Sequence, residues 1–142
     1  AKDYVEAMWL ILQQNEPEDF VIATGETTPV RDFIKMAFAE LGIVIAFAGE
    51  GIHEVATVAA CNHPEYQLPI GKEVMCIDPK YFRPTEVELL IGDPTKAKSK
   101  LGWQPKYNLK TLVEEMVQAD VSYFKQHQIL ENAGFTSYRP QE

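Results

Sequence analysis

The residues best suited to bind a ligand lie in the stretch Asp78–Val87, which reads Asp-Pro-Lys-Tyr-Phe-Arg-Pro-Thr-Glu-Val. Arg83 stands between an aromatic pair and a proline, and a residue that precedes proline is biased toward extended backbone. Its guanidinium has the planar set of donors that binds a pyrophosphate with paired, charge-assisted hydrogen bonds. Glu86, three residues later, has the acceptor oxygens that ribose hydroxyls need. An Arg–Glu ion pair in a surface loop explains the same residues, and their chemistry alone favours that simpler interpretation.

A second cation, Arg31, stands near the start of a predicted helix after a glycine turn, where it could approach an anion. Pairing with Asp32 or Glu26 explains the same position, and the residues alone favour this structural role. We nevertheless keep Arg31 as a candidate for substrate binding.

Other patterns that carry chemistry are missing from the sequence. It contains no GxGxxG or GxxGxxG loop for a dinucleotide, no GxxxxGK[ST] loop, and no tyrosine followed four residues later by lysine. Its two cysteines and three histidines do not have the spacing of metal ligands. We therefore expect no catalytic residue, no cofactor-binding residue and no metal site in this chain.

Hydrophobic spacing predicts the helices that position these residues. Apolar side chains recur every three or four positions over residues 3–14 and 30–41, which indicates two amphipathic helices. Thr28-Pro29 and Asp93-Pro94 are each typical of a helix start, with Thr28 or Asp93 as N-cap and proline at the first helical position. Asn108 is expected to cap a long last helix.

Short apolar runs at residues 20–23, 43–47 and 73–78 predict three strands. Residues 48–72 show no clear period and predict a long irregular loop. The resulting order of elements indicates a mixed α/β fold with too few strands for a complete doubly wound sheet. We assign residues 1–131 to one domain and residues 132–142 to a C-terminal tail.

Composition narrows the function classes. The chain has 142 residues, of which 46% are hydrophobic, and a formal net charge of −8. Such an acidic chain is not expected to bind nucleic acid, which requires many Lys and Arg contacts to phosphate. No run of apolar residues is long enough to span a membrane. The absence of an initiator Met predicts a piece of a longer polypeptide, and the two cysteines are consistent with a reduced, cytoplasmic protein.

Several groups of residues resemble the GDP-mannose 4,6-dehydratases, which belong to the extended short-chain dehydrogenase/reductases. The more specific groups are Pro-Glu-Asp-Phe-Val-Ile-Ala-Thr-Gly at residues 17–25 and Tyr-Phe-Arg-Pro-Thr-Glu at residues 81–86. A third group, Lys-Leu-Gly-Trp-Gln-Pro at residues 100–105, is similar to many nucleotide-sugar enzymes and is less specific. The resemblance covers nearly the whole chain, and residues 48–72 depart most from the family pattern.

The resemblance implies a small mixed α/β substrate-binding domain that lacks the Rossmann sheet half of an intact enzyme. Such an enzyme removes water from GDP-mannose to give GDP-4-keto-6-deoxymannose, a step of GDP-fucose biosynthesis. A tightly held NADP takes a hydride from C4 of the sugar and returns it at C6. The family's catalytic residues and NADP site lie in the N-terminal half, which has no counterpart here.

By the same resemblance, Arg83 contacts the pyrophosphate of GDP-mannose and Glu86 contacts a ribose hydroxyl. The chain alone is then expected to be inactive, and the intact enzyme is expected to be a cytoplasmic homo-oligomer. Two alternatives stay open at this point. The chain could be the substrate domain of an epimerase or decarboxylase that uses a UDP-sugar, which competition between GDP and UDP would reveal. A non-catalytic binding module is the alternative if the chain is naturally complete.

Overall fold

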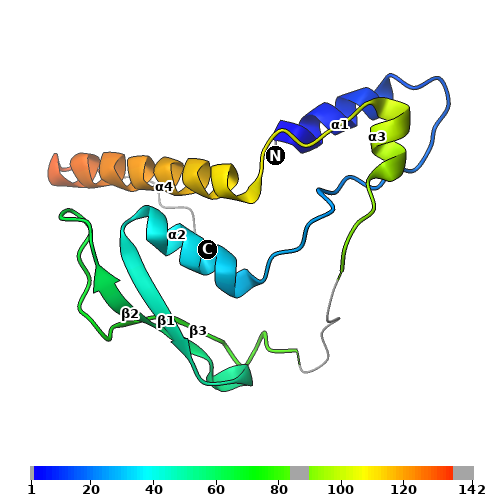
Figure 1. Cartoon of the computed structure of the whole chain (residues 1–142). Coiled ribbons are helices and arrows are strands. Elements are labelled where there is room, and N and C mark those ends of the chain that lie inside the picture. Colours follow the sequence, from blue (N-terminus) through cyan, green and yellow to red (C-terminus); the bar gives the residue numbers. More distant parts are fainter. Residues whose placement is uncertain (1, 84–89, 136–142) are drawn as a thin grey trace.

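The computed structural model describes residues 2–83 and 90–135, which form a mixed α/β structure (Figure 1). The α-helices of the described part are α1 (Lys2–Leu12), α2 (Val30–Glu40), α3 (Thr95–Leu101) and α4 (Leu109–Asn132). The strands are β1 (Ile43–Ala48), β2 (Val55–Cys61) and β3 (Glu73–Cys76), and a short 3-10 helix, η1 (Gly51–His53), lies between β1 and β2. The mixed α/β class predicted from the sequence is confirmed.

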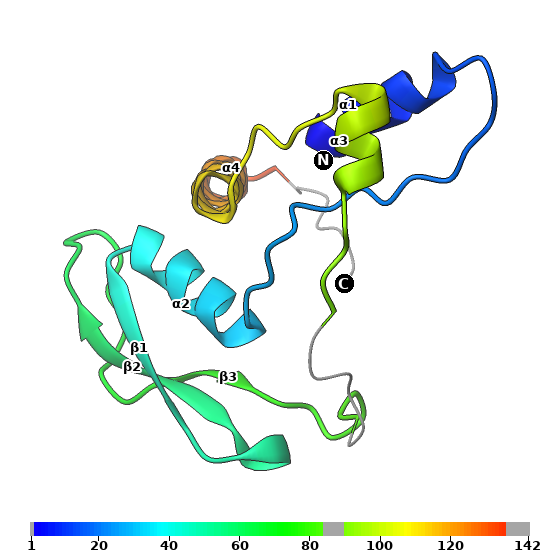
Figure 2. The same cartoon turned by 45° about the vertical axis from the view of Figure 1, so that its right-hand side comes forward.

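The strands form an antiparallel sheet in the order β1-β2-β3, and α2 covers one face of it. Alternate residues of β1 and β2 are buried on that face because side chains of a strand point to opposite sides in turn. The buried residues are Ile43, Ile45, Ala56 and Val58. On its other side α2 contacts α4, so that sheet, α2 and α4 are stacked in three layers (Figures 1 and 2).

A second, smaller apolar cluster lies where α1 meets α3, away from the sheet (Figure 2). Its buried residues are Ala7, Ala97, Leu101 and Trp103, with Phe20 and Ile22 packed against them. Trp103 is only 2% exposed. The described part of the chain therefore has two separate cores, joined by the chain segments that lead into α2 and out of α3.

Asp3 and Trp103 connect the first helix to the segment before the last one. The indole Nε1 of Trp103 donates a hydrogen bond of 3.0 Å to the backbone carbonyl of Asp3. The Oδ2 atom of Asp3 accepts from the backbone N–H groups of Lys106 and Tyr107, both at 3.1 Å. These bonds fix the path of residues 103–107 and hence the point at which α4 begins.

Two predictions about strands were wrong. Residues 20–23 run extended, but they form no ladder with any other described residue. Residues 48–72 are not an irregular loop, since they include η1 and the central strand β2. In β2, Val-Ala-Thr-Val-Ala-Ala-Cys, the buried positions are Ala56 and Val58, but the exposed Ala59 is also apolar, and this hides the alternation that marks a strand. The strands predicted at 43–47 and 73–78 are confirmed as β1 and β3, with somewhat different ends.

Helix starts were predicted with partial success. Asn108 caps α4 as expected, because its side chain accepts a hydrogen bond from the N–H of Thr111. Thr28 is not the N-cap of α2, since Pro29 occupies that position and provides no side-chain cap. Pro94 likewise occupies the N-cap position of α3, although Asp93 still accepts from the N–H of Thr95 at 2.9 Å. The predicted division between domain and tail stays a prediction, and residues 136–142 lie outside the described part.

Replacing Trp103 by Phe should lower the free energy of unfolding by about 1–3 kcal/mol, because the hydrogen bond to Asp3 is lost and a small cavity is left. The measurement is urea unfolding followed by far-ultraviolet circular dichroism. Trp9→Phe is the matched control, since the side chain of Trp9 lies on the surface. Equal effects of the two substitutions would contradict the role assigned to Trp103.

Asp93 should titrate below its ordinary pKa of 3.8, because the hydroxyl and then the backbone N–H of Thr95 donate to its carboxylate. A lowered pKa means that Asp93 stabilises the fold above its unfolded-state pKa, and that this contribution disappears as the pH falls through the lower folded value. Carboxyl carbon NMR measures the midpoint directly. Thr95→Val removes the hydroxyl donor and should move the midpoint back toward 3.8; no movement would exclude this hydrogen bond as the main cause.

Candidate functional site

Arg83 is exposed and follows a tight turn after β3. Asp78 forms that turn, as its carboxylate accepts from the N–H of Lys80 at 2.9 Å and its carbonyl accepts from the N–H of Tyr81 at 3.0 Å. Phe82 lies against η1, since a Cβ atom added to Gly51 would stand 4.0 Å from the Cζ atom of the Phe82 ring. The residue before Arg83 is thus held against the end of the β1–β2 hairpin.

The chain is anchored again shortly after this stretch. The carbonyl of Leu90 accepts a hydrogen bond of 3.1 Å from the hydroxyl of Thr27. Gly92 packs so closely on the segment before α2 that an added Cβ atom would lie 2.6 Å from the Cβ of Ala23. Glu86, the predicted ribose contact, lies outside the described residues.

Arg31 forms an ion pair with Glu54, the residue that follows η1, and not with the predicted partners Asp32 or Glu26. The guanidinium carbon of Arg31 also lies 5.5 Å from the centroid of the Phe47 ring. The Glu54 side chain is only 14% exposed, so Arg31 is the opposite charge that its carboxylate meets away from bulk water. Arg31 therefore has a structural role, although with a partner that is distant in sequence.

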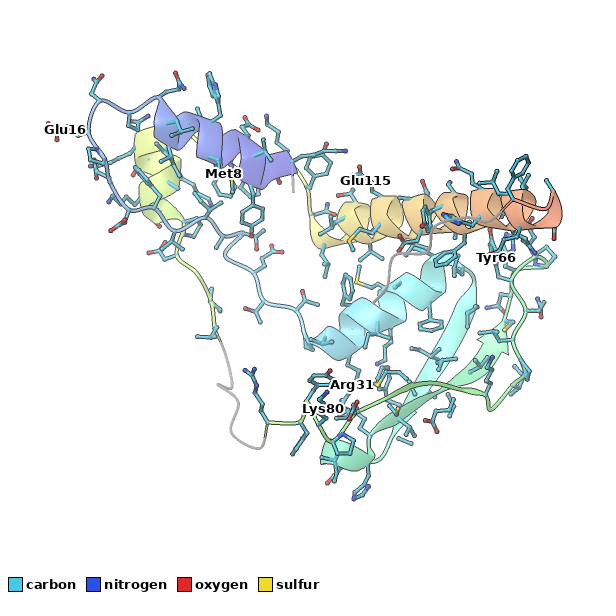
Figure 3. All side chains as sticks on the ribbon, turned by 180° about the vertical axis from the view of Figure 1, so that it is seen from behind. Met8, Glu16, Arg31, Tyr66, Lys80 and Glu115 are labelled. Carbon is cyan, nitrogen blue, oxygen red and sulfur yellow. The ribbon has the colours of Figure 1, made fainter. Side chains whose placement is uncertain are left out.

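The end of the β1–β2 hairpin brings the predicted site residues into one neighbourhood. Gly51, at the start of η1, contacts Phe82, while Glu54, just after η1, binds Arg31. Thr27, which precedes α2 in the chain, donates its hydroxyl hydrogen bond to the carbonyl of Leu90. Figure 3 shows Arg31 and Lys80 at this same end of the sheet. The structure thus places Arg31 beside the stretch that carries Arg83.

The charges at this end are not equally available to a ligand. The positive charge of Arg31 is shared with Glu54, whereas Arg83 forms no ion pair with any other described residue. Lys80, which the sequence interpretation did not single out, is another cation in the turn and lies 5.3 Å from the centroid of the Tyr81 ring. An exposed guanidinium without a described acidic partner is suited to bind an anion such as a pyrophosphate.

The hollows of the surface lie elsewhere. A mainly apolar hollow of about 620 Å³ lies between α2, α4 and Tyr66, and another of about 510 Å³ lies between residues 24–28 and the start of α4. Neither is lined by Arg83 or Arg31.

Two further observations concern the described residues alone. They contain no group of three or more His, Cys, Asp or Glu side chains placed to hold a metal ion. None of their helices combines the length and the apolar character needed to cross a membrane.

Comparison with known proteins gives the family. The family model described as GDP-mannose 4,6 dehydratase matches residues 1–116. The chain belongs to the GDP-mannose 4,6-dehydratase family. It is similar to the GDP-mannose 4,6-dehydratase of Yersinia enterocolitica, with 50% identity over 137 residues, or 95% of this chain. It is similar to the enzymes of the same name from Dictyostelium discoideum and Homo sapiens, with 51% and 50% identity, each over 88% of this chain.

The chain spans only part of each relative. It covers 37% of the length of the Yersinia protein, 33% of the Dictyostelium protein and 31% of the human protein. The chain therefore corresponds to a portion of a larger family polypeptide. The family predicted from the sequence motifs is confirmed.

Arg31→Ala should destabilise the chain by about 1–3 kcal/mol, because it leaves the nearly buried carboxylate of Glu54 without its partner. Lys35→Ala is the matched control, since the pair of Lys35 with Asp32 spans 3.8 Å and is exposed on both sides. Adding Glu54→Gln to Arg31→Ala should recover most of the loss. Urea unfolding of Arg31→Ala, Glu54→Gln, the double variant and the Lys35→Ala control measures this coupling, and a purely additive result would rule out the pair as a stabilising contact.

Proposed function

We propose that this chain is the substrate-binding part of a GDP-mannose 4,6-dehydratase, a lyase that converts GDP-mannose to GDP-4-keto-6-deoxymannose. Family membership over residues 1–116 carries the proposal. The position of Arg83 supports it: the residue is exposed, follows Phe82, which lies against η1, and forms no ion pair with another described residue. This is the arrangement that a preformed diphosphate grip needs.

In this proposal Arg83 binds the pyrophosphate and Glu86 accepts a hydrogen bond from a ribose hydroxyl. Arg31 adds a second cation at the same end of the molecule. Through its ion pair with Glu54 it also holds the end of the β1–β2 hairpin in place. The short turn formed by Asp78 then sets where Arg83 enters the site. These residues bind and orient the nucleotide end of the substrate, and none of them carries out the dehydration.

The intact enzyme uses NADP in this proposal, but the residues of this chain do not fit that cofactor. The sequence has no glycine-rich loop after a strand that would approach a dinucleotide pyrophosphate. We therefore propose that NADP is bound by the remaining, Rossmann-like part of the polypeptide, as in other short-chain dehydrogenase/reductases. The intact enzyme is proposed to be a cytoplasmic homo-oligomer, and this chain alone is proposed to be inactive.

Arg83→Ala in the intact enzyme should weaken GDP-mannose binding by about 2 kcal/mol or more, roughly 30-fold, because a charged hydrogen-bond donor to the diphosphate is lost. Isothermal titration calorimetry measures the binding constant. Lys80→Ala removes a cation from the same turn and is the matched control, with a much smaller expected effect. Arg83→Lys should be intermediate, since lysine keeps the charge but not the paired geometry. An unchanged constant for Arg83→Ala would remove this residue from the site.

The preference for the nucleotide base is tested on this chain alone. Amide NMR spectra of the chain are recorded with GDP-mannose and, separately, with UDP-glucose. Shifts near Arg83 with GDP-mannose alone support a guanosine-nucleotide grip. Equal shifts with both sugars would argue for the UDP-sugar alternative and against the proposal.

A further inference from the structure

The end of the β1–β2 hairpin is held in one fixed shape. A Cβ atom added to Gly49, which has φ +85°, would overlap the backbone carbonyl of His53, so this position has room for glycine only. Gly51 has φ +57°, a left-handed conformation that also favours glycine. The N–H of His53 donates to the carbonyl of Glu50 at 3.1 Å, and the N–H of Glu54 donates to the carbonyl of Gly51 at 3.2 Å. These bonds close η1.

The same hairpin end is tied to α2. The Glu54 carboxylate, just after η1, forms its ion pair with Arg31 in the first turn of α2. The Phe47 ring of β1 lies 5.5 Å from the guanidinium carbon of Arg31. The hairpin end is therefore attached to a helix that itself packs on the sheet.

Phe82 rests on this hairpin end, directly before Arg83. The Cζ atom of its ring stands 4.0 Å from a Cβ atom added to Gly51, an ordinary van der Waals distance. Phe82 is 39% exposed, whereas the neighbouring Tyr81 is 72% exposed. Of these two aromatic side chains, Phe82 is the one that the fold largely covers.

We infer that Phe82 is a positioning residue for diphosphate binding, and that its contact with Gly51 sets where Arg83 presents its guanidinium. The inference rests on the proposed function, in which Arg83 binds the diphosphate. Arg83 forms no ion pair with another described residue, so no described partner of that kind orients its side chain. Its backbone is instead directed by Phe82, because the peptide unit that joins the two residues is planar and does not rotate.

Diphosphate binding by an arginine makes this positioning important. Paired hydrogen bonds to phosphate oxygens require the donors of a functional site to be held within about 0.5 Å of the productive geometry. Phe82 restrains Arg83 from one side of the chain. Pro84 follows in the sequence and biases Arg83 toward extended backbone. A buried ring that only fills space would have no effect specific to Arg83, and this difference can be measured.

A double-mutant cycle in the intact enzyme that carries this chain separates the two roles. Phe82→Ala should raise the dissociation constant of GDP-mannose about 10-fold, because a displaced guanidinium loses its paired geometry. In an Arg83→Ala background the same substitution should have almost no further effect, since Phe82 acts through Arg83. Isothermal titration calorimetry measures all three variants. Equal effects of Phe82→Ala in both backgrounds would overturn the inference.

Two further variants of the aromatic pair serve as controls in the same assay. Phe82→Leu keeps an apolar contact with Gly51 and should retain most of the affinity for GDP-mannose. Tyr81→Ala removes the exposed neighbouring ring and should leave the dissociation constant nearly unchanged. An effect of Tyr81→Ala as large as that of Phe82→Ala would contradict the inference, because it would indicate direct contact of both rings with the ligand.

A matched pair of substitutions at Gly51 tests the contact without any nucleotide sugar. Gly51→Ala and Gly51→Leu share the strain of the left-handed backbone, but only the longer leucine side chain displaces the Phe82 ring. Amide hydrogen exchange over residues 80–83 of the ligand-free intact enzyme should therefore be several-fold faster in Gly51→Leu than in Gly51→Ala. Equal exchange in the two variants would rule out the contact as the restraint on Arg83.

The two measurements fail independently of each other. If Arg83→Ala leaves GDP-mannose binding unchanged, the proposed function of Arg83 is wrong, and with it the role inferred for Phe82. If Arg83→Ala weakens binding while Gly51→Leu and Gly51→Ala exchange alike, the proposed function stands and only the positioning role of Phe82 is wrong.

Discussion

The bond between the Trp103 indole and the Asp3 carbonyl joins residues one hundred positions apart, and the arrangement of the helices depends on it. It closes the smaller core, in which only four residues are buried. The Asp3 carboxylate then holds residues 106 and 107 just before α4 begins. α4 packs on α2, and α2 packs on the sheet. These hydrogen bonds therefore help to set how the core between α2 and the sheet lies relative to the smaller core.

A chain with two small cores has limited hydrophobic stabilisation, because few side chains are fully removed from water. Nine hydrophobic residues of the described part are buried, while many large apolar residues remain exposed on α1 and α4. Such a balance is unusual for an independent domain and expected for part of a larger protein. The family relatives, which are almost three times as long as the matched region, agree with this interpretation.

The residues that hold the candidate site in place are different from the residue proposed to bind the diphosphate. Phe82 lies against Gly51, and the carbonyl of Leu90 accepts a hydrogen bond from the hydroxyl of Thr27. Arg31 and Glu54 stabilise the hairpin end that forms the first anchor. This division leaves Arg83 free of described ion pairs, and a cation that is held in place but not neutralised is suited to bind a diphosphate.

The sequence by itself determined the features that rest on local contacts. The helical repeats, the Asn108 cap and the left-handed Gly102 at the end of α3 depend on residues within a few positions, and the family motifs identified the family. Tertiary structure decided the rest. β2 could not be recognised because apolar residues occupy its exposed positions as well as its buried ones. The strand-like segment 20–23 forms no ladder with any other described residue, and pairing is a non-local contact that the sequence does not reveal. Arg31 pairs with Glu54 and not with Asp32 or Glu26, because the β1–β2 hairpin brings the Glu54 carboxylate against the guanidinium.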